Sequence, residues 1–155
     1  MRLILLAAGT RLPAWVGAGF SEYAERMPPE LRLELVEIPL GAHGKVEPAK
    51  AAREEGERML ARLPARAQLV ALEVTGRPWS SEQLAREIER WMMDGRDVAF
   101  AIGGPVGLAP EVVASAAQRW SLGPLTLPHA LVRPLVAEAL YRAWTIVRGL
   151  PYHRA

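Results

Sequence analysis

The chain contains no cysteine in its 155 residues. This absence excludes disulfide bonds, thiolate metal sites and cysteine nucleophiles. The three histidines, His43, His129 and His153, stand too far apart to form a metal-ligand motif, and neither H-E-x-x-H nor G-x-S-x-G occurs. The sequence therefore supports neither a bound metal nor a hydrolase.

Long apolar runs are also missing. No stretch approaches the ~20 consecutive apolar residues that a membrane-spanning helix needs. The opening run MRLILLAAG is followed by Arg11 and Pro13 where a signal peptide would continue its apolar segment, so it predicts a first strand. We expect a soluble, cytoplasmic protein with no membrane partner.

Lysine is nearly absent, because Lys45 and Lys50 are the only two among 19 basic residues. An arginine bias suits contacts to phosphates and stacked bases, but it follows equally from a GC-rich genome. We favour the genomic explanation for most of the arginines.

Positive charge is concentrated in the last quarter of the chain, although the whole carries a formal charge of only +2. From residue 119 onward a single acid, Glu138, stands against five arginines: Arg119, Arg133, Arg142, Arg148 and Arg154. A local basic surface of this kind attracts phosphate groups.

The chain ends with Tyr152, His153 and Arg154, which supply a stacking ring, an imidazole and a guanidinium in consecutive positions. These residue types favour a tail that contacts nucleotides, while a fortuitous polar terminus explains them equally well. Because Gly149 and Pro151 end the preceding helix, we expect the three side chains to be displayed rather than packed.

Strand-like and helix-like segments alternate along the chain. Apolar runs predict strands at 2–8, 31–38, 68–74, 98–102 and 125–127, and helical spacing predicts helices at 13–26, 48–63, 110–118 and 133–147, with a further helix capped by Ser80 and Gln83. This alternation favours an α/β fold with a largely parallel sheet and flanking helices. No linker or repeat interrupts it, so we expect one domain over residues 1–155.

A glycine-rich loop, residues 103–107, follows the predicted strand 98–102. Such loops at the carboxyl ends of parallel strands let a ligand approach the backbone, which makes this one a candidate binding site. A purely structural turn is the alternative, because neither G-x-G-x-x-G nor the P-loop motif is present.

Five ordered segments match a known family: MRLILLAAGTRLPAWVGAGFSEYAER, LVALEVTGRPWSSEQLAREIE, DVAFAIGGPVGL, WSLGPLTLPHALVRPLVAEALYRAWTIV and the final PYHR. Nearly end to end, the chain resembles the ribosomal RNA large subunit methyltransferase H family. The resemblance implies a SPOUT-class fold with a C-terminal trefoil knot, S-adenosylmethionine as cofactor, and a homodimer. It also implies methylation of N3 of a pseudouridine in large-subunit (23S) ribosomal RNA.

The family's cofactor loops fall on three segments of this sequence. By resemblance, the cofactor-binding residues are Leu72, Glu73, Gly103, Gly104, Leu122, Gly123, Pro124, Leu125, Thr126, Leu127 and Pro128. Gly123 and Pro124 depart from the family's more usual serine there, a change that matters little where backbone groups make the contacts.

Methyl transfer from a sulfonium requires in-line positioning of the nucleophile and removal of the N3 proton, and it needs no metal. We assign His153 as the proton acceptor or relay, Arg154 as a phosphate contact and Tyr152 as a base-stacking ring. His129, Glu138 and Arg142 are expected to line the entrance. If the tail reaches the partner subunit's cofactor, as the family suggests, each active site is composite.

Two other functions stay open from the residues. The basic tail would suit a ribosome-binding assembly factor with a vestigial cofactor pocket, and the glycine loop would suit a dinucleotide-binding oxidoreductase.

The helix predicted over 133–147 carries more apolar surface than one buried face needs, which predicts a homodimer interface along it.

Overall fold

The computed structural model describes residues 1–153, and for His153 the backbone alone; Arg154 and Ala155 lie outside the described residues. Five strands form one sheet in the order β2-β1-β4-β3-β5, and every neighbouring pair is parallel. The strands are β1 (Arg2–Ala8), β2 (Arg32–Ile38), β3 (Gln68–Pro78), β4 (Val98–Ile102) and β5 (Gln118–Ser121). The prediction of an α/β fold with a parallel sheet is confirmed.

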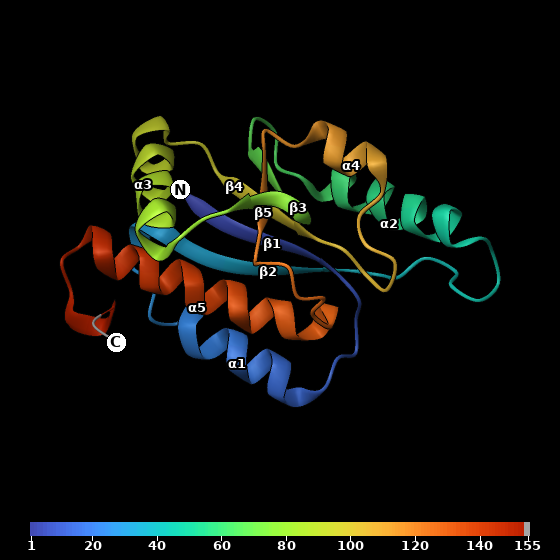
Figure 1. Cartoon of the computed structure of the whole chain (residues 1–155), viewed down its shortest axis with the longest axis horizontal. Coiled ribbons are helices and arrows are strands. Elements are labelled where there is room, and N and C mark those ends of the chain that lie inside the picture. Colours follow the sequence, from blue (N-terminus) through green and yellow to red (C-terminus); the bar gives the residue numbers. More distant parts are fainter. Residues whose placement is uncertain (154–155) are drawn as a thin grey trace.

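Helices cover both faces of this sheet (Figure 1). They are α1 (Ala14–Ala24), α2 (Pro48–Arg62), α3 (Ser81–Asp94), α4 (Pro110–Ser115) and α5 (His129–Val147), with short 3-10 helices η1 (Pro29–Leu31) and η2 (Pro151–His153). Helices α1, α3 and α5 share one hydrophobic core with the sheet, whereas α2 and α4 share a second core on the opposite face. The central strands are buried on both sides for this reason.

The apolar runs explain why β1 and β4 occupy the centre. Every residue of β4 and residues 3–8 of β1 are buried, because helices lie over both faces of these strands. Continuous apolar strands of this kind are typical of parallel sheets covered on both sides. The alternating strand β2 lies at an edge, as its partly polar pattern requires.

The predicted start of α3 is confirmed in detail. The Ser80 hydroxyl accepts a hydrogen bond from the Gln83 backbone N–H at 3.1 Å, and the Gln83 side chain accepts from the Ser80 N–H at 2.7 Å. This capping box satisfies two backbone donors that would otherwise lack partners. The helix ends at Gly95, whose φ of 82° is the left-handed conformation that glycine adopts at low cost.

The chain between α4 and α5 differs from the sequence prediction. The helix expected at 110–118 ends at Ser115, and Gln118 instead begins β5, a strand that we did not predict. The strand expected at 125–127 is wrong, since these residues form a loop. Helix α5 begins at His129 rather than at 133 and contains Pro134, which packs against Gly19 of α1. Tertiary packing decides these boundaries, not local propensity.

Strand β3 is longer than predicted because it continues past an irregularity. Trp120 of β5 lies opposite both Leu72 and Arg77 of β3, so residues 73–76 are looped out of the pairing. A side chain at Gly76 would place its Cβ 2.7 Å from the carbonyl carbon of Arg119, which only glycine avoids. The looped-out residues project from the sheet where its strands end, and they help to form the site described next.

Candidate functional site

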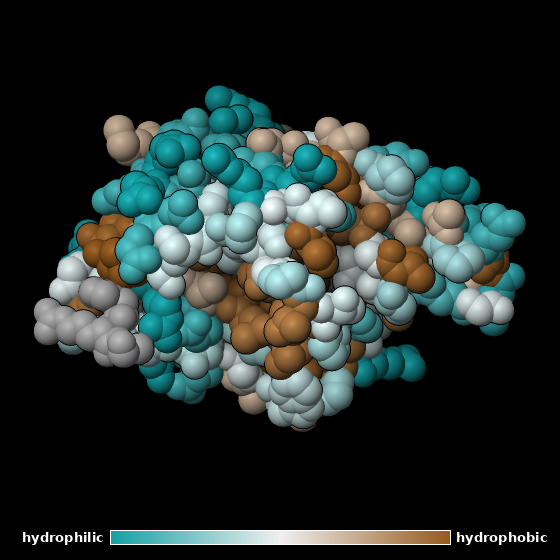
Figure 2. Space-filling model, in the orientation of Figure 1, coloured by the Kyte–Doolittle hydropathy of each residue, from teal (hydrophilic) through white to brown (hydrophobic). Residues whose placement is uncertain are grey.

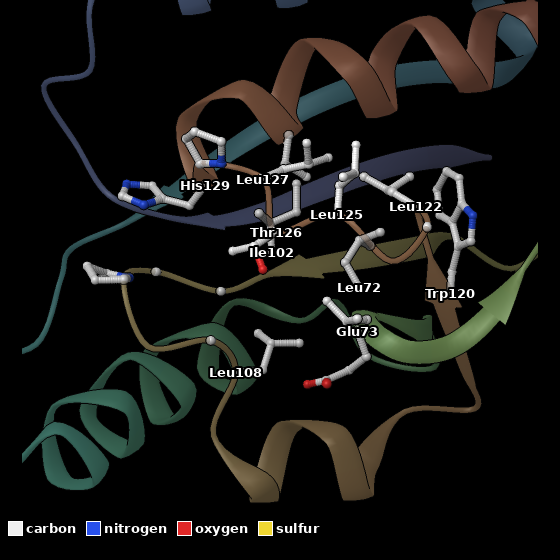
Figure 3. A pocket seen from close by; sticks show the side chains of 18 residues that line it. Leu72, Glu73, Ile102, Leu108, Trp120, Leu122, Leu125, Thr126, Leu127 and His129 are labelled. Carbon is white, nitrogen blue, oxygen red and sulfur yellow. The ribbon is translucent and has the colours of Figure 1, made fainter.

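A pocket of about 520 Å³ lies beyond the carboxyl end of β4, beside the irregularity in β3 (Figure 3). Three segments form it: residues 72–74 of β3, the glycine-rich loop after β4, and the chain from β5 to the start of α5. Its lining residues are Leu72, Glu73, Val74, Ile102, Gly103, Gly104, Pro105, Gly107, Leu108, Trp120, Leu122, Gly123, Leu125, Thr126, Leu127, Pro128, His129 and Val132. This is the position where open parallel sheets bind ligands.

The structure brings the expected cofactor positions together. All of them except Pro124 line this one pocket, although they come from three distant parts of the sequence. Sequence reasoning missed Trp120 and Val132 as pocket residues, because apolar side chains in a strand and a helix carry no signal beyond core packing. It had placed His129 at the entrance, and His129 does line the pocket.

The glycine-rich loop is both a tight turn and a wall of the pocket. A Cβ at Gly103 would lie 2.5 Å from the carbonyl carbon of Gly107, and the Gly107 N–H donates to the Gly104 carbonyl oxygen at 3.1 Å. Gly107 itself has a φ of 82°. A Cβ at Gly104 would point toward Glu55 and Leu40, neither of which lines the pocket, so the backbone of Gly104 is what faces a ligand.

The pocket's chemistry suits a small organic molecule with apolar and polar parts. Its volume lies within the range of roughly 300–1,000 Å³ that small-molecule sites occupy, and five leucines and one isoleucine are among its lining residues. The carboxylate of Glu73, the hydroxyl of Thr126 and the imidazole of His129 supply the polar side-chain groups. The backbone of Gly103 and Gly104 adds further hydrogen-bonding groups. These features fit S-adenosylmethionine, which combines a flat aromatic base with hydroxyl, amino and carboxylate groups.

A buried arginine holds the first turns of α5 against the sheet. The side chain of Arg133 is 1% exposed, and its Nη2 donates to the carbonyl oxygens of Ala8 at 3.2 Å and Gly9 at 2.7 Å. Its Nη1 donates to Glu37 Oε2 at 2.7 Å. His129 lies one helical turn earlier, with its Nε2 also close to Gly9. In the sequence Arg133 is one of several arginines near the chain end, and no local pattern predicted that its side chain would be buried. We call its hydrogen bonds to Ala8, Gly9 and Glu37 the Arg133 clamp.

The residues near the chain end form a separate cluster on α5. The Tyr152 hydroxyl donates to Glu138 Oε1 at 3.1 Å, and Arg142 pairs with the same oxygen at 2.7 Å. The Tyr152 ring lies edge-on to Tyr141, with centroids 4.7 Å apart, and the Arg142 guanidinium lies over it at 5.1 Å. The expectation that Tyr152 is displayed is therefore wrong, because η2 folds back onto the helix.

This packing changes the titration of the tyrosine. Burial, followed by neighbouring Tyr23 and the negative charge of Glu138, raises the pKa of Tyr152 to about 12. The adjacent carboxylate also raises the pKa of Arg142. Both groups therefore keep their protons throughout the physiological range.

The pocket and the tail cluster lie apart along α5. Glu138 is nine residues beyond His129, which is about 13 Å along a helix that rises ~1.5 Å per residue. Glu138, Arg142 and Tyr152 do not line the pocket of their own chain, contrary to the expectation for the first two. Arg154 and the side chain of His153 lie outside the described residues. Among the described residues of one chain, the pocket and the tail cluster are therefore separate groups.

Apolar side chains gather around the pocket on the molecular surface. The face shown in Figure 2 has a hollow at its centre surrounded by hydrophobic residues. Leu125 is 73% exposed and Val74 is 59% exposed, and both line the pocket. Such an exposed patch is typical of an interaction surface.

Within residues 1–153, no cluster of three or more His, Cys, Asp or Glu side chains could hold a metal ion. Among the helices of the same residues, none is long and apolar enough to cross a membrane.

Comparisons with known proteins agree with the geometry of the site. A family model described as "Predicted SPOUT methyltransferase" matches residues 1–153. The chain therefore belongs to the SPOUT methyltransferase family.

Among individual proteins, it is 59% identical to ribosomal RNA large subunit methyltransferase H of Pseudomonas paraeruginosa over 155 residues, covering 99% of this chain and 100% of the relative. The enzyme of the same name from Pseudomonas putida F1 is 57% identical, with the same coverage. The Legionella pneumophila protein Lpg2936, solved in complex with bound SAM, has a TM-score of 0.50 at 13% identity, covering 92% of this chain and 66% of that one.

Membership confirms the resemblance inferred from the sequence. The protein is an S-adenosylmethionine-dependent methyltransferase, and the dinucleotide-binding oxidoreductase is set aside. The structural neighbour supports the fold at this level of identity.

Proposed function

We propose that this protein methylates N3 of a pseudouridine in large-subunit (23S) ribosomal RNA. The observation that carries the proposal is the single pocket built from the three loops that the family uses for its cofactor. The names of relatives at 57–59% identity over the whole chain support ribosomal RNA as the substrate. A ribosomal substrate also favours a cytoplasmic location.

We also propose that residues 1–155 form one SPOUT domain with a trefoil knot. The family match over residues 1–153 and the one sheet shared by both hydrophobic cores support the single domain. The chain passes from α4 on one face, through the edge strand β5, to α5 on the other, beside the loop 103–107. This crossing is compatible with a knot, and the family match supports one.

When bound, S-adenosylmethionine supplies an electrophilic methyl group on a positively charged sulfur. The backbone of Gly103 and Gly104 and the apolar walls around Leu72 would hold it and exclude water from it. The Glu73 carboxylate stands where it can accept hydrogen bonds from hydroxyl or amino groups. The chain's own groups must then orient the base and take the N3 proton.

In the proposal, the last residues of the chain supply these groups, together with Glu138 and Arg142 of α5. His153 would accept or relay the N3 proton, Arg154 would hold a phosphate, and Tyr152 would stack on or orient the base. Glu138 and Arg142 would position Tyr152, since both already contact its side chain. Because Glu138, Arg142 and Tyr152 do not line the pocket of their own chain, the proposal requires the tail of one subunit to serve the pocket of another.

We therefore propose a homodimer with composite active sites. The apolar surface around the pocket, including Leu125 and Val74, supports an interface beside the cofactor. On α5, Leu135 is 40% exposed, and its other apolar side chains are either buried, as Val136 and Leu140 are, or only partly exposed. The most exposed apolar side chains beside the pocket are Leu125 and Val74, so we propose that the interface predicted along α5 extends to the pocket rim.

Subunit complementation tests the composite site directly. One variant carries Gly104→Val, which disturbs the pocket but keeps the tail, and the other ends at Pro151, which keeps the pocket but lacks the tail. Each alone should fail to methylate ribosomal particles. A mixture allowed to exchange subunits should regain activity, because a heterodimer contains one complete site. No recovery, with exchange verified by differently tagged subunits, would contradict the composite site.

Two further measurements separate the remaining alternatives. Calorimetry should show binding of S-adenosylmethionine and S-adenosylhomocysteine. Mass mapping of large-subunit ribosomal RNA from a deletion strain should show the loss of one pseudouridine methyl mark, restored by the wild-type chain. An intact mark in the deletion strain would instead favour a ribosome-binding assembly factor. Monomers by light scattering at micromolar concentration would contradict the dimer.

A further inference from the structure

A buried carboxylate lies directly behind the glycine-rich loop of the pocket. Glu55 of α2 is 2% exposed. Its Oε2 accepts a hydrogen bond from the Gly41 N–H at 3.0 Å and contacts His43 Nε2. Its Oε1 is buried and has no hydrogen-bond partner among the described residues. Burying a polar oxygen without a partner is unfavourable for folding, so the position needs another explanation.

Side chains of α2 hold the loop from Pro39 to Val46 in place. Arg58 donates to the carbonyl oxygens of Pro39 at 2.9 Å and Leu40 at 2.8 Å. Glu54 Oε2 accepts from the Ala42 N–H at 3.2 Å. The loop lies so close to the helix that a Cβ at Gly41 would be 2.2 Å from the Ala51 carbonyl oxygen. The loop is therefore fixed to α2 along its length.

This fixed loop and Glu55 together fill the space behind Gly104. A Cβ at Gly104 would lie 3.0 Å from Glu55 Oε1 and 3.0 Å from Leu40 Cδ2. Neither Glu55 nor Leu40 lines the pocket, whereas Gly104 does. The two side chains thus support the face of Gly104 that points away from the ligand. Any movement of this support would shift the backbone that the ligand contacts.

We propose that Glu55 is a positioning residue of the methyl-donor pocket. Its Oε2 anchors the loop at Gly41 and His43, and its Oε1 sets how far the Gly104 backbone can withdraw from the ligand. The proposal rests on the pocket being the methyl-donor site. It adds a residue outside the pocket that controls donor affinity without touching the donor.

Calorimetry with S-adenosylhomocysteine tests this proposal on the full-length protein. Glu55→Ala should weaken binding by about tenfold or more, because small displacements of contacting groups have large effects. Glu55→Gln, which keeps the volume but loses the charge, should fall between Glu55→Ala and the wild type. Glu57→Gln on the same helix is the control, since Glu57 is exposed and forms no ion pair or hydrogen bond among the described residues. Its affinity should match the wild type.

A double-mutant cycle separates support of Gly104 from general destabilisation. Gly104→Ala should weaken binding strongly in the wild type and less in the Glu55→Ala background, because removing the carboxylate relieves one of the two close contacts of the new methyl group and leaves only the contact with Leu40. Additive losses would overturn the proposal, as would unchanged affinity of Glu55→Ala in a protein with native circular dichroism.

Steady-state methylation gives an independent readout. Glu55→Ala should raise KM for S-adenosylmethionine while kcat on ribosomal particles changes little, the pattern of a group that acts in ground-state binding. A loss confined to kcat would contradict the positioning role. If the wild type did not bind S-adenosylhomocysteine, the proposed function itself would be contradicted. If the wild type bound it and the Glu55 variants bound it with the same affinity, only the role proposed for Glu55 would be contradicted.

Discussion

Replacing Arg133 by methionine should destabilise the protein more than any other single arginine change. The guanidinium is 1% exposed and donates to two backbone carbonyls, of Ala8 and Gly9, that lie at the carboxyl end of β1. Methionine has similar length but no donor, so both carbonyls would lose this hydrogen bond. Leaving a buried acceptor unsatisfied costs about 1–3 kcal/mol.

The ion pair with Glu37 adds little to this sum. The Glu37 side chain is 43% exposed and can regain water, and exposed pairs contribute about 0–1 kcal/mol. Removing a buried charge also recovers part of its desolvation cost. The net loss should therefore be about 2–4 kcal/mol. For a chain of this length that corresponds to a fall in Tm of roughly 5–15 °C.

Urea denaturation followed by circular dichroism measures this loss. Arg86→Met on α3 is the matched control, because Arg86 is exposed and no hydrogen bond or ion pair is recorded for it among residues 1–153. Arg133→Lys should fall between the two, since it keeps the charge but cannot reach several acceptors at once. If Arg133→Met and Arg86→Met differed by less than about 1 kcal/mol, the clamp would be energetically unimportant.

Three further changes have distinct expected outcomes. Ser80→Ala removes both the N-cap acceptor and half of the capping box, and it should lower the free energy of unfolding by about 1 kcal/mol in urea titrations. Gly76→Ala should cost more than 1 kcal/mol by the same assay, because the new Cβ meets the backbone of β5. Tyr152→Phe should alter the alkaline limb of stability: the folded-state pKa of Tyr152 is about 12 against an ordinary value of 10.0, so the folded state holds this proton more tightly. The stabilisation from this proton is complete below pH 10 and is lost as the pH rises toward 12. The free energy of unfolding should therefore fall over this range in the wild type, and Tyr152→Phe should lack that part of the fall. A parallel decline in both proteins would refute the burial of Tyr152.

Strands β1 to β4 and most helices could be predicted from local pattern, because each of these segments shows a single clear periodicity or a continuous apolar run. Strands β1 and β4 are continuous apolar runs, and α3 carries an explicit capping box. Strand β5 was missed because four residues, QRWS, have no strand periodicity; pairing with β3 alone makes them a strand. The run 125–127 was predicted as a strand because its leucines are apolar, but these side chains line the pocket.

The pocket could be assigned only through family resemblance. Residues 72–73, 103–104 and 122–128 share no motif, and only the fold brings them together. Arg133 and Glu55 were beyond either approach, since an arginine in a basic tail and a glutamate in a polar helix look like surface residues. Both side chains are buried by residues elsewhere in the sequence, so their own neighbours in the chain do not indicate it.

The aromatic side chains beside the pocket give the protein a built-in optical reporter. Trp120 lines the pocket and stacks on Trp79, with ring centroids 5.6 Å apart, and Phe100 and Trp91 extend the same cluster. Excitation energy absorbed by any of these indoles can pass to its neighbours over such short separations. A ligand that enters the pocket changes the surroundings of Trp120 and hence the emission of the whole group. Occupancy of the site can therefore be followed by intrinsic fluorescence in unlabelled protein, with Trp15 and Trp144, which do not line the pocket, contributing the background.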